Sequence, residues 1–262
     1  MPSNYPNMRI GFIGVGNIAS SLVEGLCTSG LAGLEIFLSP RNASKSAALA
    51  ERYAHVRRLG SNQEVLDRSE IVFISVRPAM APSVLKELAF REDHMVVSLV
   101  ALLNYSELKE LVRPATQVSR AIPLPSVVRH NCPIPLYHAG AQVVQLFGYL
   151  GEPLPVHDEE QLHAIWSLTG LIAPYYELMA GLSEWTMTHG VAPATANAYV
   201  ANLFQSLSYL AQHADPIDFR EMAKHATTPG GINEQAGKEI REKGAHDAWI
   251  TAVDGVLLRF QW

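Results

Sequence analysis

A glycine motif near the start of the chain constrains the fold more than any other feature of the sequence. The apolar segment Met8–Ile13 predicts a short buried strand, and Gly14–Ala19 follows it with the pattern G-x-G-x-x-A before a helical pattern. Gly14 permits the tight turn, Gly16 lets the backbone approach a pyrophosphate, and Ala19 lets the helix pack on the strand. This setting favours dinucleotide binding over a plain tight turn. The expected cofactor contacts here are Ile13, Gly14, Val15, Gly16, Asn17 and Ile18.

The end of the next predicted strand, Leu34–Leu38, indicates which nicotinamide cofactor is bound. An NAD site usually has Asp or Glu at this point for the ribose 2′-hydroxyl, whereas an NADP site has small polar and cationic groups for the 2′-phosphate. No acid stands here, and Ser39 and Arg41 are followed by Asn42 and Lys45. A guanidinium can hold a phosphate through paired hydrogen bonds. We therefore predict NADP, used as NADPH; the alternative is an ordinary solvated basic loop.

Strand and helix patterns alternate through the rest of the first half, which predicts a Rossmann-type, doubly wound parallel sheet of the α/β class. Ligands bind at the carboxyl edge of such sheets. Further strands are expected at 56–59, 70–75, 95–100 and 117–122, and helices at 43–53, 80–90 and 105–112, with a brief helix capped by Asn62. The loop residues expected at the cofactor are Asn62, Ser75, Val76, Arg77, Pro78 and Ala101.

Prolines crowd residues 123–157, which excludes long helices and predicts extended turns with one helix near 140–150. We place a domain boundary near His157. Residues 1–157 then form the dinucleotide-binding domain, and residues 158–262 form an all-helical domain for substrate binding and dimerisation. In that second domain, the apolar residues of 192–212 cover more than one helix face, as expected of a buried helix or a subunit interface.

A second glycine-bearing turn occurs late in the chain, at Pro229-Gly230-Gly231, before a helix predicted over 233–243. Backbone N–H groups at such a turn can hold a substrate carboxylate. Taken alone, the pattern is more typical of an ordinary helix start. Behind a dinucleotide fold, the anion-site interpretation is the better one.

Composition excludes several classes of function. The net charge of −5 gives no attraction for nucleic acid, and no apolar run approaches the roughly 20 residues that cross a membrane. The N-terminus lacks the pattern of a signal peptide. Two cysteines without a zinc or disulfide pattern fit a reducing cytosol, so we expect a cytoplasmic protein. We expect no metal site, since His157 and His163 are six residues apart, which does not suit one helix face.

Five segments in this order, GFIGVGNIA, SVRP, VSLVA, SRAIP and TTPGG, resemble the pyrroline-5-carboxylate reductase family over nearly the whole chain. The resemblance implies an N-terminal dinucleotide-binding domain and a C-terminal helical dimerisation domain. It implies a homodimer or higher homo-oligomer whose subunits interlock and complete each other's substrate pocket. It also implies NADPH-dependent reduction of a cyclic imine carboxylate, namely 1-pyrroline-5-carboxylate to L-proline in proline biosynthesis.

The resemblance further implies the substrate residues. TTPGG is similar to the family loop that holds the substrate carboxylate, and the family threonine that bonds the imine nitrogen falls at Asn233. Three residues are expected at the catalytic centre: Asn233, Thr228 and Tyr175, the last positioning substrate or donating a proton unless it only packs. The substrate-binding set is Pro229, Gly230, Gly231, Ile232 and Asn233.

Two segments depart from the family pattern, PLPS at 123–126 and TGLIAPYY at 169–176. They leave two alternatives open. Instead of reducing 1-pyrroline-5-carboxylate, the chain would be a reductase for a different imine or a 3-hydroxy acid, or it would be a non-catalytic NADP-binding regulator. Lys224, Lys238 and Lys243 lack the setting of the catalytic lysine of 3-hydroxy acid dehydrogenases, which disfavours that substrate.

Overall fold

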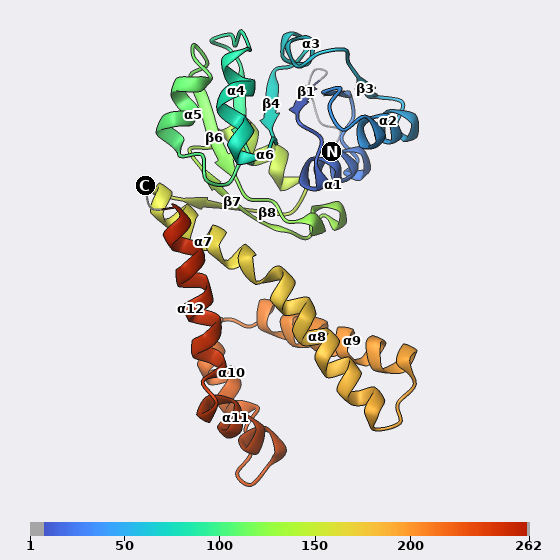
Figure 1. Ribbon diagram of the computed structural model, residues 1–262, viewed down its shortest axis with the longest axis vertical. Coiled ribbons are helices and arrows are strands. Elements are labelled where there is room, and N and C mark those ends of the chain that lie inside the picture. Colours follow the sequence, from blue (N-terminus) through green and yellow to red (C-terminus); the bar gives the residue numbers. More distant parts are fainter. Residues whose placement is uncertain (1–7, 261–262) are drawn as a thin grey trace. The chain divides into compact units, whose positions relative to one another are not determined.

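The computed structural model describes residues 8–260, and Figure 1 shows their helices and strands. The chain divides into two compact units, the first ending at Ile165 and the second beginning at Trp166. This division falls within helix α7 (Glu159–Leu168), whereas the boundary that we predict near His157 precedes this helix. We call the two parts the sheet unit and the helical unit.

The described residues of the sheet unit form an eight-stranded sheet in the order β3-β2-β1-β4-β5-β6-β7-β8. All neighbouring strands are parallel except β6 and β7. The chain winds outward from β1 in both directions, which confirms the doubly wound α/β class. The strands are β1 (Met8–Ile13), β2 (Leu34–Leu38), β3 (Val56–Arg58), β4 (Ile71–Ile74), β5 (Met95–Ser98), β6 (Gln117–Ala121), β7 (Pro133–Tyr137) and β8 (Glu152–Val156).

Helices connect these strands and cover both faces of the sheet. They are α1 (Asn17–Thr28), α2 (Ala43–Arg52), α3 (Asn62–Arg68), α4 (Ala81–Lys86), α5 (Tyr105–Leu111) and α6 (Ala141–Gly148). The 3₁₀ turns Pro78–Met80 and Pro125–Arg129 complete the connections. The brief helix at Asn62 is confirmed, but its N-cap is Ser61, whose side chain accepts a hydrogen bond from the Glu64 N–H. The helix predicted over 80–90 is shorter than expected.

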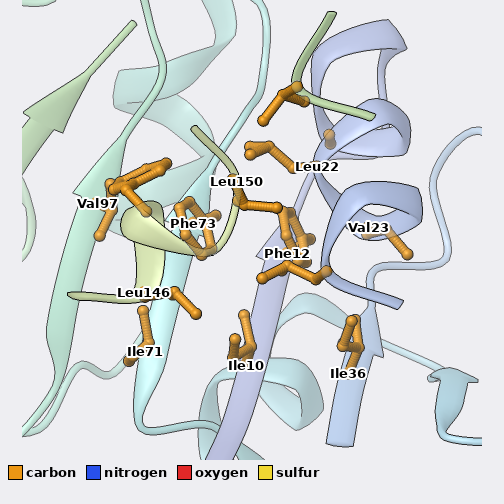
Figure 2. Packing of buried hydrophobic residues seen from close by; sticks show 14 of the residues in the cluster. Ile10, Phe12, Leu22, Val23, Ile36, Ile71, Phe73, Val97, Leu146 and Leu150 are labelled. Atoms are coloured by element: carbon orange, nitrogen blue, oxygen red, sulfur yellow. The ribbon is translucent and has the colours of Figure 1, made fainter. Parts of the chain in front are cut away.

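Apolar side chains from the central strands form the core of the sheet unit. The rings of Phe12 and Phe73 stack with centroids 4.8 Å apart, and Phe147 of α6 meets Phe73 edge-on at 5.8 Å. Figure 2 shows Leu22 and Val23 packed on the same side of the sheet. The opposite face is covered by α3, α4 and α5 through Val65, Leu66, Leu85 and Leu108. These two layers hold the carboxyl ends of the strands in fixed register.

The proline-rich segment differs from the prediction. Residues 133–137 and 152–156 are strands β7 and β8 instead of extended turns, and the predicted helix between them is confirmed as α6. In β7, the Pro135 carbonyl still accepts from the Ile122 N–H at 3.1 Å. In β8, the Glu152 N–H donates to the Cys132 carbonyl. Because N–H groups alternate along a strand, Pro153 and Pro155 occupy positions that face away from β7 and need no donor.

Up to residue 260, the last one described, the helical unit consists of helices without a sheet. The 3₁₀ turn Thr169–Leu171 leads into α8 (Ile172–Thr188), which packs on α9 (Pro193–Gln212). The helices that follow are α10 (Phe219–His225), α11 (Ile232–Glu242) and α12 (Ala245–Leu257), with a last 3₁₀ turn, Leu258–Phe260. The two helices predicted here are thereby confirmed to within one residue at each end. None of the helices in the described range 8–260 combines the length and apolarity that a membrane span requires.

Candidate functional site

A cleft of about 640 Å³ opens at the carboxyl edge of the sheet. It brings together three segments that lie far apart in the sequence: the glycine turn after β1, the loop after β2 and the loop after β4. Parallel pairing of β1 with both β2 and β4 makes these three strand ends neighbours. The lining residues are Gly14, Val15, Gly16, Asn17, Arg41, Asn42, Lys45, Ser75, Val76, Arg77 and Met80.

Glycine is required in the turn itself. Gly14 has a φ of +93°, in the left-handed region, and a Cβ there would lie 2.6 Å from the Ser75 carbonyl oxygen. Gly16 is the N-cap of α1, has open space around it, and leaves the first helical turn without a side-chain cap. The unsatisfied N–H groups at this helix start therefore face the cleft and suit phosphate oxygens.

Two side chains from the end of β2 fix the glycine turn from behind. Ser39 is fully buried, and its Oγ accepts a hydrogen bond of 2.9 Å from the Gly14 N–H. Asn42 has a left-handed backbone (φ 62°) and donates from Nδ2 to the Val15 carbonyl at 2.8 Å. Small polar residues after β2 therefore stabilise the glycine turn. They also stand where an NAD site would have an acidic residue.

Three cations, Arg41, Lys45 and Arg77, line the cleft, and none of its described lining residues is acidic. Lys45 Nζ donates to Asn17 Oδ1, which places an ammonium group beside the start of α1. The positive end of a helix and three cationic side chains in one cleft suit a ligand with several phosphates. The donors present here fit a dinucleotide that carries an additional phosphate.

Eight of the predicted cofactor residues line this cleft: Gly14, Val15, Gly16, Asn17, Arg41, Ser75, Val76 and Arg77. Six do not. Ile13 and Ser39 are fully buried behind the cleft, Ile18 packs on the core, and Asn62 is the first residue of α3. Pro78 begins a 3₁₀ turn and Ala101 follows β5. For these six, contact with the cofactor stays a prediction.

Met80 is a lining residue that the sequence did not indicate, because one methionine in a loop carries no pattern. Asn42 and Lys45, predicted with Ser39 and Arg41 as the polar and cationic groups that favour NADP, also line the cleft.

The late glycine turn has a defined geometry of its own. The Gly231 N–H donates to the Thr228 carbonyl at 2.9 Å, and Gly230 has a φ of +72°. With Pro229 at the second position this is a type II turn, which requires glycine at its third position. Gly231 is the N-cap of α11, and a Cβ there would lie 2.4 Å from Thr228 Oγ1.

Asn233 lies in the first turn of α11, and its Nδ2 donates to the Ala226 carbonyl at 2.8 Å. This bond uses the amide nitrogen, so Oδ1 is the atom left to accept a hydrogen bond. Ile232, at the first position of the helix, is 84% exposed. Thr228, Pro229, Gly230, Gly231, Ile232 and Asn233 thus form one exposed loop and helix start.

Tyr175 lies on α8, half-buried, with its ring edge-on to Phe204 of α9 at 5.6 Å. This contact is a packing contact between two helices. A role for Tyr175 in catalysis stays a prediction.

A buried charge at the end of β6 was not anticipated from the sequence. Arg120 is fully buried; its guanidinium pairs with Glu159 and lies 2.9 Å from His163 Nε2. Burial lowers the pKa of Arg120, against the opposing effect of Glu159, and burial and the neighbouring Arg120 lower the pKa of His163. Glu159 also accepts from the Tyr105 N–H at 2.6 Å. The cluster thus connects β6, α5 and the first turn of α7.

No group of three or more metal-ligating side chains is found in the part of the chain from 8 to 260.

The doubly wound sheet and its cationic cleft define a Rossmann-type dinucleotide-binding protein. Residues 9–102 match the family described as NADP oxidoreductase, coenzyme F420-dependent, and residues 159–261 match pyrroline-5-carboxylate reductase dimerisation. The chain is 32% identical to rat pyrroline-5-carboxylate reductase 3 over 266 residues, covering 96% of this chain and 94% of the relative. It belongs to the pyrroline-5-carboxylate reductase family.

Other relatives agree. The Pseudomonas aeruginosa pyrroline-5-carboxylate reductase is 27% identical over 248 residues, covering 90% of this chain and 89% of that protein. The crystal structure of the Streptococcus pyogenes 1-pyrroline-5-carboxylate reductase superimposes with a TM-score of 0.83 at 19% identity, covering 97% of this chain and 99% of that one. The Plasmodium falciparum pyrroline carboxylate reductase, solved with NADP bound, gives 0.83 at 16% identity, covering 97% of both chains. These two structures share the fold.

Proposed function

We propose that this protein uses NADPH to reduce 1-pyrroline-5-carboxylate to L-proline, by direct hydride transfer to the imine carbon, in proline biosynthesis. The observation that carries the proposal is the cleft at the glycine turn, where helix N–H groups and three cations meet without an acid. Family membership and the Pro-Gly-Gly loop support the substrate assignment.

NADPH supplies a hydride from C4 of its nicotinamide. In this proposal the start of α1 holds the pyrophosphate, and Arg41 and Lys45 hold the 2′-phosphate that distinguishes NADP from NAD. Ser39 supports the turn through the Gly14 N–H and replaces the acid that a 2′-hydroxyl would need.

The reduction needs little catalytic help from side chains, because the carbon of a protonated imine accepts hydride without further activation. The protein must bring the donor and acceptor carbons to roughly 3.5 Å and exclude water. In this proposal the N–H groups of Gly230 and of Ile232, the first residue of α11, hold the substrate carboxylate. Asn233 Oδ1 accepts from the iminium N–H, because Nδ2 is already bonded to Ala226. Thr228 supports the loop on which this depends.

The dimerisation family match supports a homo-oligomer, and a homodimer with interlocked helices is part of the proposal. Large apolar side chains are exposed along α8 and α9, as a subunit interface needs. We also propose a cytoplasmic location, which the two free cysteines support.

The test follows NADPH oxidation at 340 nm with 1-pyrroline-5-carboxylate, with other cyclic imines and a 3-hydroxy acid run alongside. We expect turnover with 1-pyrroline-5-carboxylate. Faster turnover of another imine would show that 1-pyrroline-5-carboxylate is not the preferred substrate. Tight NADPH binding without turnover of any compound would favour a non-catalytic regulator.

Two sets of variants assign the residues. Asn233→Ala should lower kcat/KM at least about tenfold, the effect of one hydrogen bond to a charged group, and Asn233→Thr should restore part of the loss. An unchanged kcat/KM in Asn233→Ala would show that Asn233 does not have the proposed role.

The double variant Arg41→Ala/Lys45→Ala should raise KM for NADPH while leaving KM for NADH nearly unchanged. The matched control is Arg57→Ala/Lys86→Ala, which removes the same charges outside the cleft.

A further inference from the structure

The chain's own carboxylate occupies part of the loop that is proposed to hold the substrate carboxylate. Glu234 lies in the first turn of α11, and its Oε2 accepts a hydrogen bond of 2.8 Å from the Gly230 N–H. The Gly231 N–H is already used within the turn, in its bond to the Thr228 carbonyl. An incoming carboxylate therefore meets a turn in which Glu234 holds the Gly230 donor.

We propose that Glu234 is a specificity-determining residue that competes with the substrate's carboxylate for the Gly230 N–H. The inference rests on the proposed function, because it assumes that this loop receives the carboxylate. A carboxylate substrate must displace the Glu234 side chain and must also approach its negative charge. A neutral imine does not compete for the Gly230 N–H and is not repelled by that charge. Glu234 thus weakens the binding of acids relative to neutral rings of the same shape.

The surroundings of Glu234 provide a second position for the displaced side chain. A hollow of about 450 Å³ along α11 is lined by Gly230, Gly231, Glu234, Gln235, Lys238 and Arg241. Lys238 is four residues after Glu234, the spacing and order at which a glutamate and a lysine attract each other on a helix. Its present partner, Glu242, is 3.8 Å away, at the long end of the ion-pair range.

Arg241 lies farther along the same side, with its guanidinium across Gly237. A Cβ on Gly237 would be 3.2 Å from Arg241 Nη1. Glu234 therefore has cations on one side and the Gly230 N–H on the other. When the Glu234 side chain moves from the loop toward Lys238, it loses the hydrogen bond from the Gly230 N–H and gains an attraction to the lysine. Displacing Glu234 therefore costs little free energy, and the substrate carboxylate can still bind.

The experiment compares an acid and its neutral counterpart. Tetrahydrofuran-2-carboxylate and tetrahydrofuran-2-carboxamide are titrated by calorimetry into the full-length protein saturated with NADPH. Three variants are used: Glu234→Gln keeps an acceptor for Gly230 and removes the charge, and Glu234→Ala removes both. Glu239→Gln removes the same charge from α11 at a residue that contacts Gln235 rather than the loop.

We expect Glu234→Gln to bind the acid about three- to fivefold more tightly than the wild-type protein does, the size of an exposed charge interaction. Glu234→Ala should bind it at least as tightly, and the affinity for the amide should stay within about twofold in both variants. Glu239→Gln should match the wild type. Circular dichroism verifies that α11 is intact in each variant.

An affinity for the acid that does not rise in Glu234→Gln, or that rises equally for the amide or in Glu239→Gln, would overturn the proposal. The reaction itself is judged separately, by NADPH oxidation with 1-pyrroline-5-carboxylate in the wild-type protein. Tighter acid binding by Glu234→Gln without that turnover would keep the role of Glu234 and reject the proposed reaction.

Discussion

The sheet unit and the helical unit bury their apolar residues to very different extents. Strands β4 and β5 are buried along their whole length, as are the last four residues of β1, and helices cover both faces of the sheet. Among the described residues of the helical unit, few apolar residues are buried: Trp166, Ala196, Val200 and Phe260. Among the described residues, every exposed large hydrophobic side chain except Leu154 lies beyond residue 165.

The difference indicates how each unit reaches stability. The sheet unit has a complete core within one chain, whereas the helical unit has long helices without enough chain to cover them. Tyr199, Leu203, Leu207 and Leu210 recur every three or four residues along α9 and are all exposed, which forms one apolar stripe. A second copy of the chain would cover such a stripe, in agreement with the match to a dimerisation family.

The largest effect is expected from a charge placed in this stripe. Leu207→Asp should dissociate the oligomer, weakening association by at least about a hundredfold, because an unpaired carboxylate would be buried in the interface. Light scattering over a range of protein concentrations measures the change. Leu154→Asp, the same substitution at an exposed leucine of β8, should leave the assembly intact. If Leu207→Asp stays oligomeric, the subunits meet elsewhere.

The second prediction compares how much stability is lost when a buried side chain is truncated in each of the two cores. Phe73→Ala removes a ring that contacts both Phe12 and Phe147 and should reduce the free energy of unfolding by about 3–5 kcal/mol. Val200→Ala, in the sparse core of the helical unit, should cost about 2 kcal/mol. Urea unfolding followed by circular dichroism gives both values. Equal losses would show that the helical core is as well packed as the sheet core.

The third effect concerns one hydrogen bond in the sheet unit. Ser39→Ala leaves the Gly14 N–H without its buried acceptor and should cost about 1–3 kcal/mol of stability. It should also raise the Kd for NADPH, measured by nicotinamide fluorescence, because the glycine turn loses support. Ser106→Ala, at an exposed serine of α5 outside the cleft, serves as the control. A wild-type Kd in Ser39→Ala would mean that the turn keeps its shape without this bond.

The smallest effect is a pH dependence that belongs to the sheet unit. His94 is fully buried; Nδ1 accepts from the Arg91 N–H at 2.9 Å, and Nε2 lies 3.2 Å from the Leu66 carbonyl. Burial, and then the charge of Arg91, lower the pKa of His94, so the unfolded chain takes up a proton more readily than the folded one. Stability is therefore full above pH 6.5, the ordinary histidine value, and falls as the pH drops below it, by at most about 1.4 kcal/mol per pH unit.

His94→Gln should flatten this slope, with His163 supplying part of what remains because its pKa is lowered in the same direction. Unfolding free energies measured between pH 7.5 and 5 provide the comparison. An identical slope in the variant would place the acid sensitivity at other groups.

The sequence predicted the parts of the fold that depend on local pattern. Apolar strands such as Ile71–Ile74 and the long apolar helix of 193–212 were found because periodicity and length are visible along the chain. Strands β7 and β8 were missed because a proline normally argues against a strand. Whether its missing N–H matters depends on which side the neighbouring strand lies, and that is not visible in the sequence.

The candidate site shows the same limit. Gly14, Gly16 and Arg41 carry a motif or a charge that identifies them, and they line the cleft. Ser39 carries the right chemistry, but its hydroxyl points to the Gly14 N–H behind the cleft. The bond between Glu234 and Gly230, and the burial of Arg120 beside Glu159, depend on side-chain directions and on contacts between distant segments. No spacing rule supplies these.

Strand β8 is the last strand of the sheet, and its outward-facing positions are Pro153 and Pro155. Since neither residue has an N–H group, this rim offers no hydrogen-bond donors at the two places where a further strand would dock. The sheet therefore resists growth into aggregates or fibrils at that rim.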